Sequence, residues 1–338
     1  MAVRPDAYAA RTPSRRGPGS AARTVRFPAA LVTTGCTVVD GGRPGLAHLG
    51  IPRGGVADRE LWAAALVICG DAPGTAVLEA GPGPFSITAE GAEVLLAVAG
   101  GCRLRLEHGE DRRAAAPWRT LRLSPGTRLS GSRVGPGCRV VVAVAGGIGT
   151  TPILGSRSPM PGTVAGERLD GVVPVHAAGR RGPDRRLIPP TWLLPPTELE
   201  VVPGPQAEAL DPAGWAALSR GPWRIDPVSG RGGIRLDGPR LEAAGPTEVP
   251  SQGVGPGAVQ LPAGGRPVIL MCDRGTTGGY PVIATVVSAD LAGAARLRPG
   301  ADVQIRVVDA ARAGRRRGAR QRAIAGLARH LRDTEETA

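Results

Sequence analysis

The residues best suited to chemistry lie near the C-terminal end, where an apolar run ends in Asp273 and Arg274. A Gly-Thr-Thr-Gly-Gly-Tyr-Pro loop (275–281) follows before a second apolar run begins. Its glycines let backbone N–H groups approach a ligand closely, Thr276 and Thr277 add hydroxyls, and Arg274 offers a forked donor. Such a loop suits a carboxylate, an amide or a phosphate. The alternative is a tight hairpin in which Asp273 and Arg274 form an internal ion pair.

Two carboxylates earlier in the chain are candidates for proton transfer. Asp40 precedes a Gly-Gly-Arg turn that ends at Arg43, and Asp58 precedes an apolar run of helical length. Each has a structural alternative. Asp40 and Arg43 would cap and clamp a turn, and Asp58 would be the N-cap of the helix.

The residue types present exclude several cofactors. The chain has no lysine, so all 42 basic residues are arginine, and neither a Schiff base nor a biotin attachment can form on it. The four histidines show no metal-ligand spacing, which predicts no metal site. The five cysteines contain no CxxC pair and mostly adjoin apolar runs, as buried, reduced thiols of a cytoplasmic protein do.

The net charge of +13 is concentrated at the two ends of the chain. Residues 1–24 hold five arginines and one acid, and residues 310–338 hold eight arginines and three acids. A nucleic-acid-binding protein instead gathers charge on one folded face with aromatic residues among it. The absence of lysine and asparagine also indicates a very GC-rich genome, such as an actinobacterial one. We therefore predict no nucleic-acid partner, and the lack of an 18-residue apolar span predicts no membrane insertion.

The pattern of apolar runs favours a mainly β fold. Gly (51) and Pro (34) separate many short runs of Val, Leu and Ile, as in barrels and sandwiches. Buried strands are expected at 93–101 and 139–147, and further strands at 197–204 and 301–309. Helices are expected at 58–70, where Gly70 follows the last apolar residue, and near 211–220.

Four segments are expected along the chain. Residues 1–24 are predicted to be disordered, and residues 25–190 form a first domain with a Pro/Arg-rich linker from 179. Residues 191–310 form a second domain. Residues 311–338 form an Arg-rich tail, with a short helix near 323–333 as a possibility.

Six segments in order resemble a family that comprises the C subunit of 5-oxoprolinase, KipA and allophanate hydrolase subunit 2. The resemblance covers about residues 27–310. It is carried by TVVDGGRPGLAHLGIPRGGVAD (37–58), ILGSRS (153–158), VVPGPQ (201–206), RGGIRLDGP (231–239), SQGVGPGAVQLPAGGRPVIL (251–270) and DRGTTGGYPVIATVVSADL (273–291).

This resemblance implies two tandem cyclophilin-like β-barrel domains with a few short helices and a cleft between them. It implies a small amide-like substrate and a companion B subunit of related fold, with ATP used through the companion subunits. A homo-oligomer is also possible. The catalytic residues implied are Asp40, Asp58 and Asp273. The substrate-binding residues implied are Arg43, Arg157, Arg231, Arg235, Gln260, Arg274, Thr276, Thr277, Gly278, Gly279 and Tyr280.

Several positions of the family pattern differ in this chain, and most of them are polar in the family. Val39 stands where the family has Gln, Gly54 where it has Ser, and Gly232 where it has Met. In the C-terminal motif, Gly275 replaces Gln and Val282 replaces Lys. Losing hydrogen-bonding groups from a polar site removes contacts that a ligand needs.

Three functions therefore remain open. The first is a component of a 5-oxoprolinase-type complex acting on a cyclic amide or urea-like C–N bond. The second is a fold recruited as a cyclase or rearrangement enzyme in specialised metabolism, with a more apolar cleft. The third is a non-catalytic regulatory partner of the KipA type.

Overall fold

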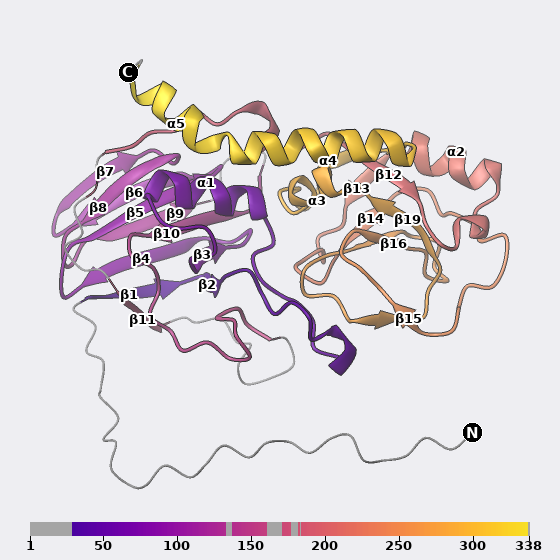
Figure 1. The fold of residues 1–338 in the computed structure, drawn as a ribbon, viewed down its shortest axis with the longest axis horizontal. Coiled ribbons are helices and arrows are strands. Elements are labelled where there is room, and N and C mark those ends of the chain that lie inside the picture. The colour runs from indigo at the N-terminus through magenta and orange to yellow at the C-terminus, as the bar shows by residue number, and fades with distance from the viewer. Residues whose placement is uncertain (1–28, 133–136, 161–170, 177–181, 183, 337–338) are drawn as a thin grey trace, which may run out of the picture.

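Two β-rich bodies lie side by side in the computed structural model, and a C-terminal helix spans both (Figure 1). The structure describes residues 29–132, 137–160, 171–176, 182 and 184–336. The predicted disordered segment 1–24 lies outside these ranges. The mainly β prediction is confirmed.

The first body consists of two antiparallel sheets. Strand order in the larger sheet is β11-β1-β4-β9-β6-β7, and in the smaller it is β2-β3-β10-β5-β8. The bounds are β1 (Ala29–Thr34), β2 (Cys36–Val39), β3 (Val77–Ala80), β4 (Phe85–Glu90), β5 (Val94–Gly100), β6 (Arg103–His108), β7 (Asp111–Ala115), β8 (Arg119–Leu123), β9 (Arg128–Ser132), β10 (Val140–Val144) and β11 (Gly171–Val175).

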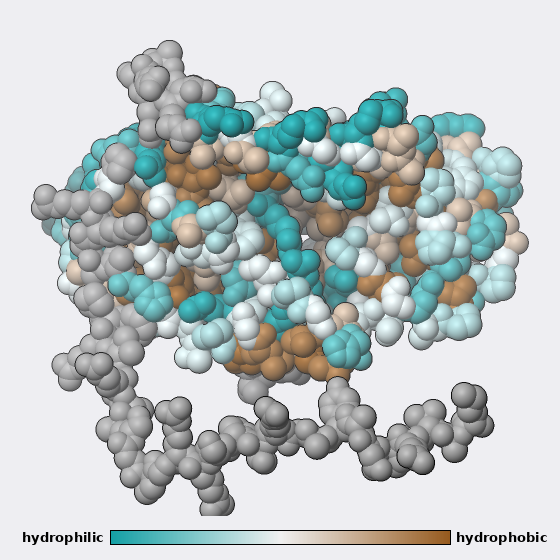
Figure 2. Space-filling view, in the orientation of Figure 1, coloured by the Kyte–Doolittle hydropathy of each residue, from teal (hydrophilic) through white to brown (hydrophobic). Residues whose placement is uncertain are grey.

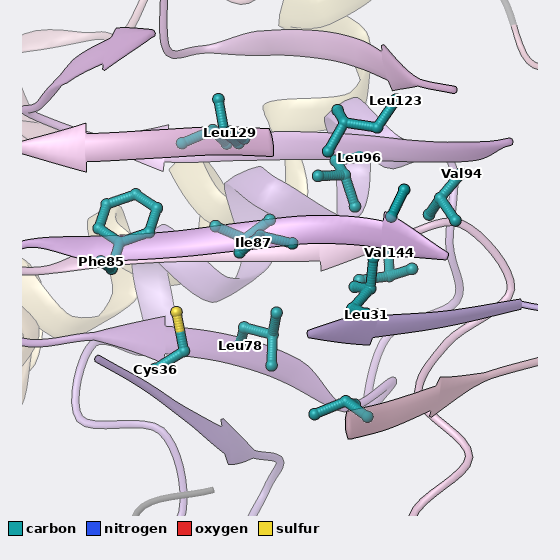
Figure 3. Packing of buried hydrophobic residues seen from close by; sticks show 14 of the residues in the cluster. Leu31, Cys36, Leu78, Phe85, Ile87, Val94, Leu96, Leu123, Leu129 and Val144 are labelled. Carbon is teal, nitrogen blue, oxygen red and sulfur yellow. The ribbon is translucent and has the colours of Figure 1, made fainter. Parts of the chain in front are cut away.

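The sequence patterns of these strands follow their place in the layers. Strand β6 alternates exposed and buried residues because only one of its faces meets the core between the two sheets. Side chains of both sheets interdigitate in that core (Figure 3). Strands β5 and β10 are buried along their whole length, because α1 (Arg59–Cys69) covers the other face of the smaller sheet.

Helix α1 begins and ends where its sequence predicts. The Asp58 carboxylate accepts hydrogen bonds from the backbone N–H groups of Glu60 and Leu61, at 3.0 and 2.9 Å. Gly70 closes the helix in the left-handed conformation that glycine adopts without strain.

The second body is a closed barrel with strand order β12-β19-β16-β17-β14-β13-β20. Its bounds are β12 (Glu198–Pro203), β13 (Trp223–Ile225), β14 (Gly233–Asp237), β16 (Ala258–Gln260), β17 (Val268–Leu270), β19 (Val282–Val286) and β20 (Asp302–Val307). A short pair outside it joins β15 (Gln252–Gly253) to β18 (Thr277–Gly278). Helix α2 (Pro212–Arg220), capped by Asp211, and α3 (Ser288–Ala294) flank the barrel.

The predicted linker belongs to the core of the first body at two points. Residues 177–181 and 183 lie outside the described ranges. Beyond them, Leu187 and Leu193 are buried in the cluster that packs on α1. Short 3-10 helices occur at η1 (Ala47–Leu49), η3 (Thr191–Leu193) and η4 (Ala207–Ala209).

The C-terminal segment is helical where a tail was predicted. Helix α4 (Ala310–Ala325) begins at an Asp309 N-cap, and α5 (Leu327–Glu336) follows it. Alanine and arginine are strong helix formers, and Leu327 and Leu331 anchor the second helix in the cluster on α1. Within the described ranges, no helix combines the length and the apolar character needed to cross a membrane.

Candidate functional site

Asp40 organises a loop rather than facing a cavity. Its carboxylate accepts four hydrogen bonds, from Ser156 Oγ, from Ser158 Oγ (2.8 Å) and from the backbone N–H groups of Gly42 (2.9 Å) and Arg157 (2.6 Å). Burial alone would raise the pKa of Asp40, but these hydrogen bonds outweigh it and lower the pKa below its ordinary value. The carboxylate is therefore used mainly to hold the 156–158 segment.

Arg43 clamps the same loop from the other side. Its guanidinium donates to the carbonyl oxygens of Ile153 (3.0 Å) and Ser158 (2.6 Å) and is buried. Arg157 donates from Nε to the carbonyl of Thr150 at 2.8 Å. These contacts match the structural alternative for Asp40 and Arg43, and they place Arg157 within the first body rather than across the boundary between the bodies.

Asp58 joins the two bodies. Besides capping α1, its carboxylate faces Arg296, which follows α3 in the second body, with an Nε–Oδ2 distance of 2.5 Å. Arg296 also donates from Nη2 to Glu60 Oε2 at 2.5 Å. All three side chains are almost completely buried. Asp58 is therefore part of a buried ionic junction, with both of its oxygens engaged.

Arg231 forms a second ionic junction. It donates to both oxygens of Asp273, at 2.6 and 3.0 Å, to Glu79 Oε1 at 2.5 Å and to the carbonyl of Gly55 at 2.6 Å. Asp273 is thus paired with Arg231 of its own body, which in turn reaches the first body. The alternative of an internal ion pair between Asp273 and Arg274 is wrong, because Asp273 pairs with Arg231 while Arg274 donates to backbone carbonyls.

Glu79 is the buried acid of this second junction. It also accepts from Arg139 Nη1 at 2.9 Å and from the backbone N–H of Ala57 at 2.8 Å. Burial opposes ionisation of Glu79, but Arg231 and Arg139 outweigh it and hold the pKa of Glu79 below its ordinary value.

This depressed pKa makes the protein sensitive to acid. The unfolded chain binds a proton at Glu79 at a higher pH than the folded chain, so the stabilisation is present above about pH 4.5 and is lost as pH falls. We expect Glu79→Gln to lose less free energy of unfolding than the wild type between about pH 5 and pH 3. Each unit of pKa depression corresponds to about 1.4 kcal/mol. Urea denaturation of both proteins across this pH range measures their free energies of unfolding. An equal loss in the wild type and in Glu79→Gln would contradict the expectation.

The Gly-Thr-Thr-Gly-Gly loop packs within the second body. Thr277 and Gly278 form β18 against β15, and the carbonyl of Thr276 accepts from Val254 N at 3.0 Å. The carbonyl of Gly279 accepts from Val249 N at 2.8 Å, and Tyr280 is exposed. Most of this loop is therefore used to build the fold.

Gln260 lies directly behind that loop. A Cβ at Gly278 would lie 2.5 Å from its Nε2, so a larger residue there would require the Gln260 side chain to shift. Gln260 is buried, and its Nε2 finds no acceptor among the described residues. Val282, at the family's lysine position, is buried with Val254 and Ala258. Arg235 is exposed on β14.

A pocket of about 350 Å³ lies where the first body, the second body and α4 meet. Figure 2 shows a hydrophilic band running between the two bodies. The charged residues that line the pocket are Arg53, Arg59, Glu60, Arg274, Arg317 and Arg320. Of the predicted ligand-binding residues, Arg274 alone reaches it.

The pocket carries uncompensated positive charge. Glu60 already pairs with Arg296 and with Arg320 (2.7 Å). Within the described part of the chain, no carboxylate forms an ion pair with Arg53, Arg59, Arg274 or Arg317. Such a surplus attracts an anion.

Burial lowers the pKa of Arg59 and of Arg274, and the charge of Arg53 lowers both further. They remain protonated at neutral pH, because a guanidinium does not lose its proton in proteins. The repulsion among these three groups is relieved when an anion binds, which favours occupancy of the pocket.

The described residues give the pocket no activated nucleophile: Ser288 lines it, but no described base accepts a hydrogen bond from its hydroxyl. Cys272 lines it, but burial raises the pKa of its thiol to about 12, so it is neutral at physiological pH. Glu60 is paired, and the three predicted catalytic acids, Asp40, Asp58 and Asp273, are all engaged in structural contacts. No group of three or more metal-ligating side chains occurs in the described ranges.

Four arginines of the pocket were missed by the sequence analysis. Arg53 and Arg59 flank the predicted Asp58 and lie in or beside the first family motif, which was a usable signal. Arg317 and Arg320 lie in the segment predicted to be a tail. Their spacing of three residues places them on the same side of a helix, but only once a helix is assumed.

A larger hollow, of about 1150 Å³, lies on the first body around β6, β7 and β9. It includes none of the predicted site residues. The pocket between the bodies is therefore the better candidate, since it joins the first and last family motifs.

Comparisons with known proteins agree with this geometry. Residues 49–307 match the family model for a carboxyltransferase domain, subdomain A and B. The chain is 34% identical to the C subunit of 5-oxoprolinase from Escherichia coli over 261 residues, covering 75% of this chain and 82% of that protein. The chain therefore belongs to the carboxyltransferase-domain family that includes this 5-oxoprolinase component.

Solved structures share the fold. The crystal structure of TTHA0988 is 32% identical with a TM-score of 0.72, covering 87% of this chain and 61% of that chain. The urea carboxylase of Kluyveromyces lactis is 23% identical with a TM-score of 0.76, covering 90% of this chain and 30% of that chain. The chain thus spans about three fifths of the first and under a third of the second.

Proposed function

We propose that this chain is the substrate-binding component of a 5-oxoprolinase-type amidohydrolase complex. In this proposal the pocket between the two bodies takes a small cyclic amide that carries a carboxylate, such as 5-oxoproline. The observation that carries the proposal is the set of four pocket arginines that form no ion pair with a described carboxylate. The name of the relative from Escherichia coli supports the same reaction.

The lack of a free base among the described pocket residues supports a companion subunit. A binding site that supplies only charge and shape stabilises an anion but cannot transfer a proton. The companion would supply the acid/base groups, and ATP would be used through it. Urea carboxylation is the less favoured reaction, since urea carries no charge for the arginines to bind. None of the five cysteines, all of them in the described ranges, forms a disulfide, which supports a reducing, cytoplasmic location.

Reconstitution tests this proposal. The full chain, assembled with its companion subunits and supplied with ATP and 5-oxoproline, is expected to yield glutamate. The same mixture without this chain is expected to be inactive, and urea in place of 5-oxoproline should not be consumed. An assembled complex that turns over urea but not 5-oxoproline would contradict the proposal.

An exposed apolar tip is the surface proposed to meet the companion. Leu49, Ile153 and Leu154 are 63%, 44% and 53% exposed. Figure 2 also shows apolar residues gathered at the lower edge of the molecule. Exposed apolar patches of this kind mark protein–protein contacts.

We expect Leu154→Asp to weaken assembly with the companion by roughly tenfold or more, because a charge would be buried in the contact. The melting temperature of the chain alone should stay the same, since this side chain lies in solvent. Analytical ultracentrifugation measures the assembly. The exposed Val228→Asp, on the second body, is the control; equal assembly of both variants would argue against this surface.

A further inference from the structure

Helix α4 lies outside the region that defines the family. The family model ends at residue 307, whereas α4 begins at Ala310. The helix nevertheless crosses from the second body to the first, as Figure 1 shows in yellow. It therefore touches both halves of the candidate site from beyond the family's own boundary.

One side of α4 is fixed by ion pairs with both bodies. Arg312 pairs with Glu200 at 2.6 Å, and Arg316 pairs with Asp290 at 2.8 Å, both in the second body. One helical turn further on, Arg320 pairs with Glu60 of the first body. These arginines repeat every four residues, so they share one side of the helix.

Arg320 is further fixed by Trp192. Its guanidinium lies 5.1 Å from the centre of the indole ring, within the range of a cation–π contact. Beyond it, Leu327 and Leu331 are buried on the first body. The position of α4 over the pocket is thus determined from both ends.

The pocket-facing side of α4 carries Arg317, Gln321 and Ile324. The spacings of four and three residues put them on one stripe of the helix. Arg317 forms no ion pair with any described carboxylate, unlike Arg312, Arg316 and Arg320 along the helix. Ile324, Met271 and Leu291 add apolar side chains to the lining of the same pocket.

We propose that α4 is a wall of the ligand pocket and that Arg317 is a specificity-determining residue, binding an oxyanion of the ligand. The oxyanion is a carboxylate or a phosphate, since a guanidinium fork matches both. This inference rests on the proposed function in one respect, the use of the pocket between the bodies as the ligand site. Arg317 lines that pocket together with arginines of both bodies, so the anion would be held from three sides.

Ligand binding by the full chain tests this inference. The probes are 5-oxoproline, its uncharged analogue 2-pyrrolidinone, and inorganic phosphate, measured by isothermal titration calorimetry. We expect Arg317→Ala to weaken binding of the anion that the wild type binds more tightly by roughly tenfold or more, the cost of one charge-assisted contact. Arg317→Lys should recover part of the loss. Binding of 2-pyrrolidinone should not change.

Arg315→Ala is the matched control. Arg315 is exposed on the same helix and does not line the pocket. The Arg315→Ala protein should bind every probe as the wild type does. Both Arg315→Ala and Arg317→Ala should keep the wild-type melting temperature. The preference between 5-oxoproline and phosphate distinguishes a carboxylate site from a phosphate site.

Two results would overturn the inference. One is a wild type that binds neither anion, and the other is an Arg317→Ala variant that binds both anions as the wild type does. Its failure differs from failure of the proposed function. If the complex with Arg317→Ala turns over 5-oxoproline with an unchanged KM, the role of Arg317 is wrong while the proposed reaction stands. If anion binding depends on Arg317 but the complex leaves 5-oxoproline intact, the proposed reaction is wrong while the role of Arg317 stands.

Discussion

Arg296→Met is expected to lower the free energy of unfolding by about 3–5 kcal/mol, the usual cost of removing one partner of a buried ion pair. Arg296 lies between Asp58 and Glu60, and the three side chains are between 0% and 3% exposed. Methionine fills a similar volume but leaves two carboxylates without this counter-charge in the interior. Asp58, whose side chain is 0% exposed, then has no cationic partner among the described residues, while Glu60 keeps its ion pair with Arg320.

Urea denaturation at neutral pH measures this loss. Arg298→Met is the control, because Arg298 is exposed two residues away and should change stability by less than about 0.5 kcal/mol. Equal stability of the two variants would mean that the junction between Asp58 and Arg296 contributes nothing to the fold.

Arg274→Met is expected to reduce kcat/KM for 5-oxoproline in the assembled complex by about 10- to 150-fold, which corresponds to about 1.5–3 kcal/mol, the value of a hydrogen bond to a charged group. Arg274 lines the pocket, and it is held in place by Nε donating to the carbonyl of Val254 at 3.0 Å. The guanidinium is thereby oriented while its charge remains available to a ligand.

Arg235→Met is the control that distinguishes an arginine lining the pocket from one that merely belongs to a family motif. Both arginines belong to family motifs, but Arg235 is exposed on β14 and does not line the pocket. It should keep wild-type kinetics. Arg274→Lys should retain part of the activity because it keeps the charge without the fork. If Arg235→Met lost as much activity as Arg274→Met, the pocket would not be the ligand site.

The local structure was predictable from the sequence, because its causes are local. Helix α1 follows from an Asp cap, a helical apolar run and a closing glycine, all within residues 58–70. The buried strands β5 and β10 follow from unbroken apolar runs. The second body closes into a barrel, as the resemblance implied.

The partners of the charged residues were not predictable in this way. Asp58 and Arg296 are 238 residues apart, and no pattern near either one identifies the other. The arginines of α4 likewise resemble those of a solvated tail in the sequence. Only the folded structure shows that they pair with Glu200 and Glu60. Long-range ion pairs depend on the completed fold, so Asp40, Asp58 and Asp273 could be named from the sequence but not assigned their structural roles.

The lost family residues affect the pocket unequally. Val282, at the lysine position, is buried in an apolar cluster with Val254 and Ala258, away from the pocket lining. Gly54, at the serine position, does line the pocket, and a Cβ there would lie 3.7 Å from Asp273 Oδ1. The serine loss therefore falls at the edge of the candidate site, where a side chain would meet Asp273, whereas the lysine loss falls in a small apolar cluster of the second body.

A crystal structure of the full chain with 5-oxoproline tests the central claim most directly. We expect the ligand to lie between the two bodies, with its carboxylate contacting guanidinium groups among Arg53, Arg59, Arg274 and Arg317. A ligand bound instead at the outer end of the 275–281 loop, or in the hollow around β6 and β7, with the pocket between the bodies empty, would contradict it.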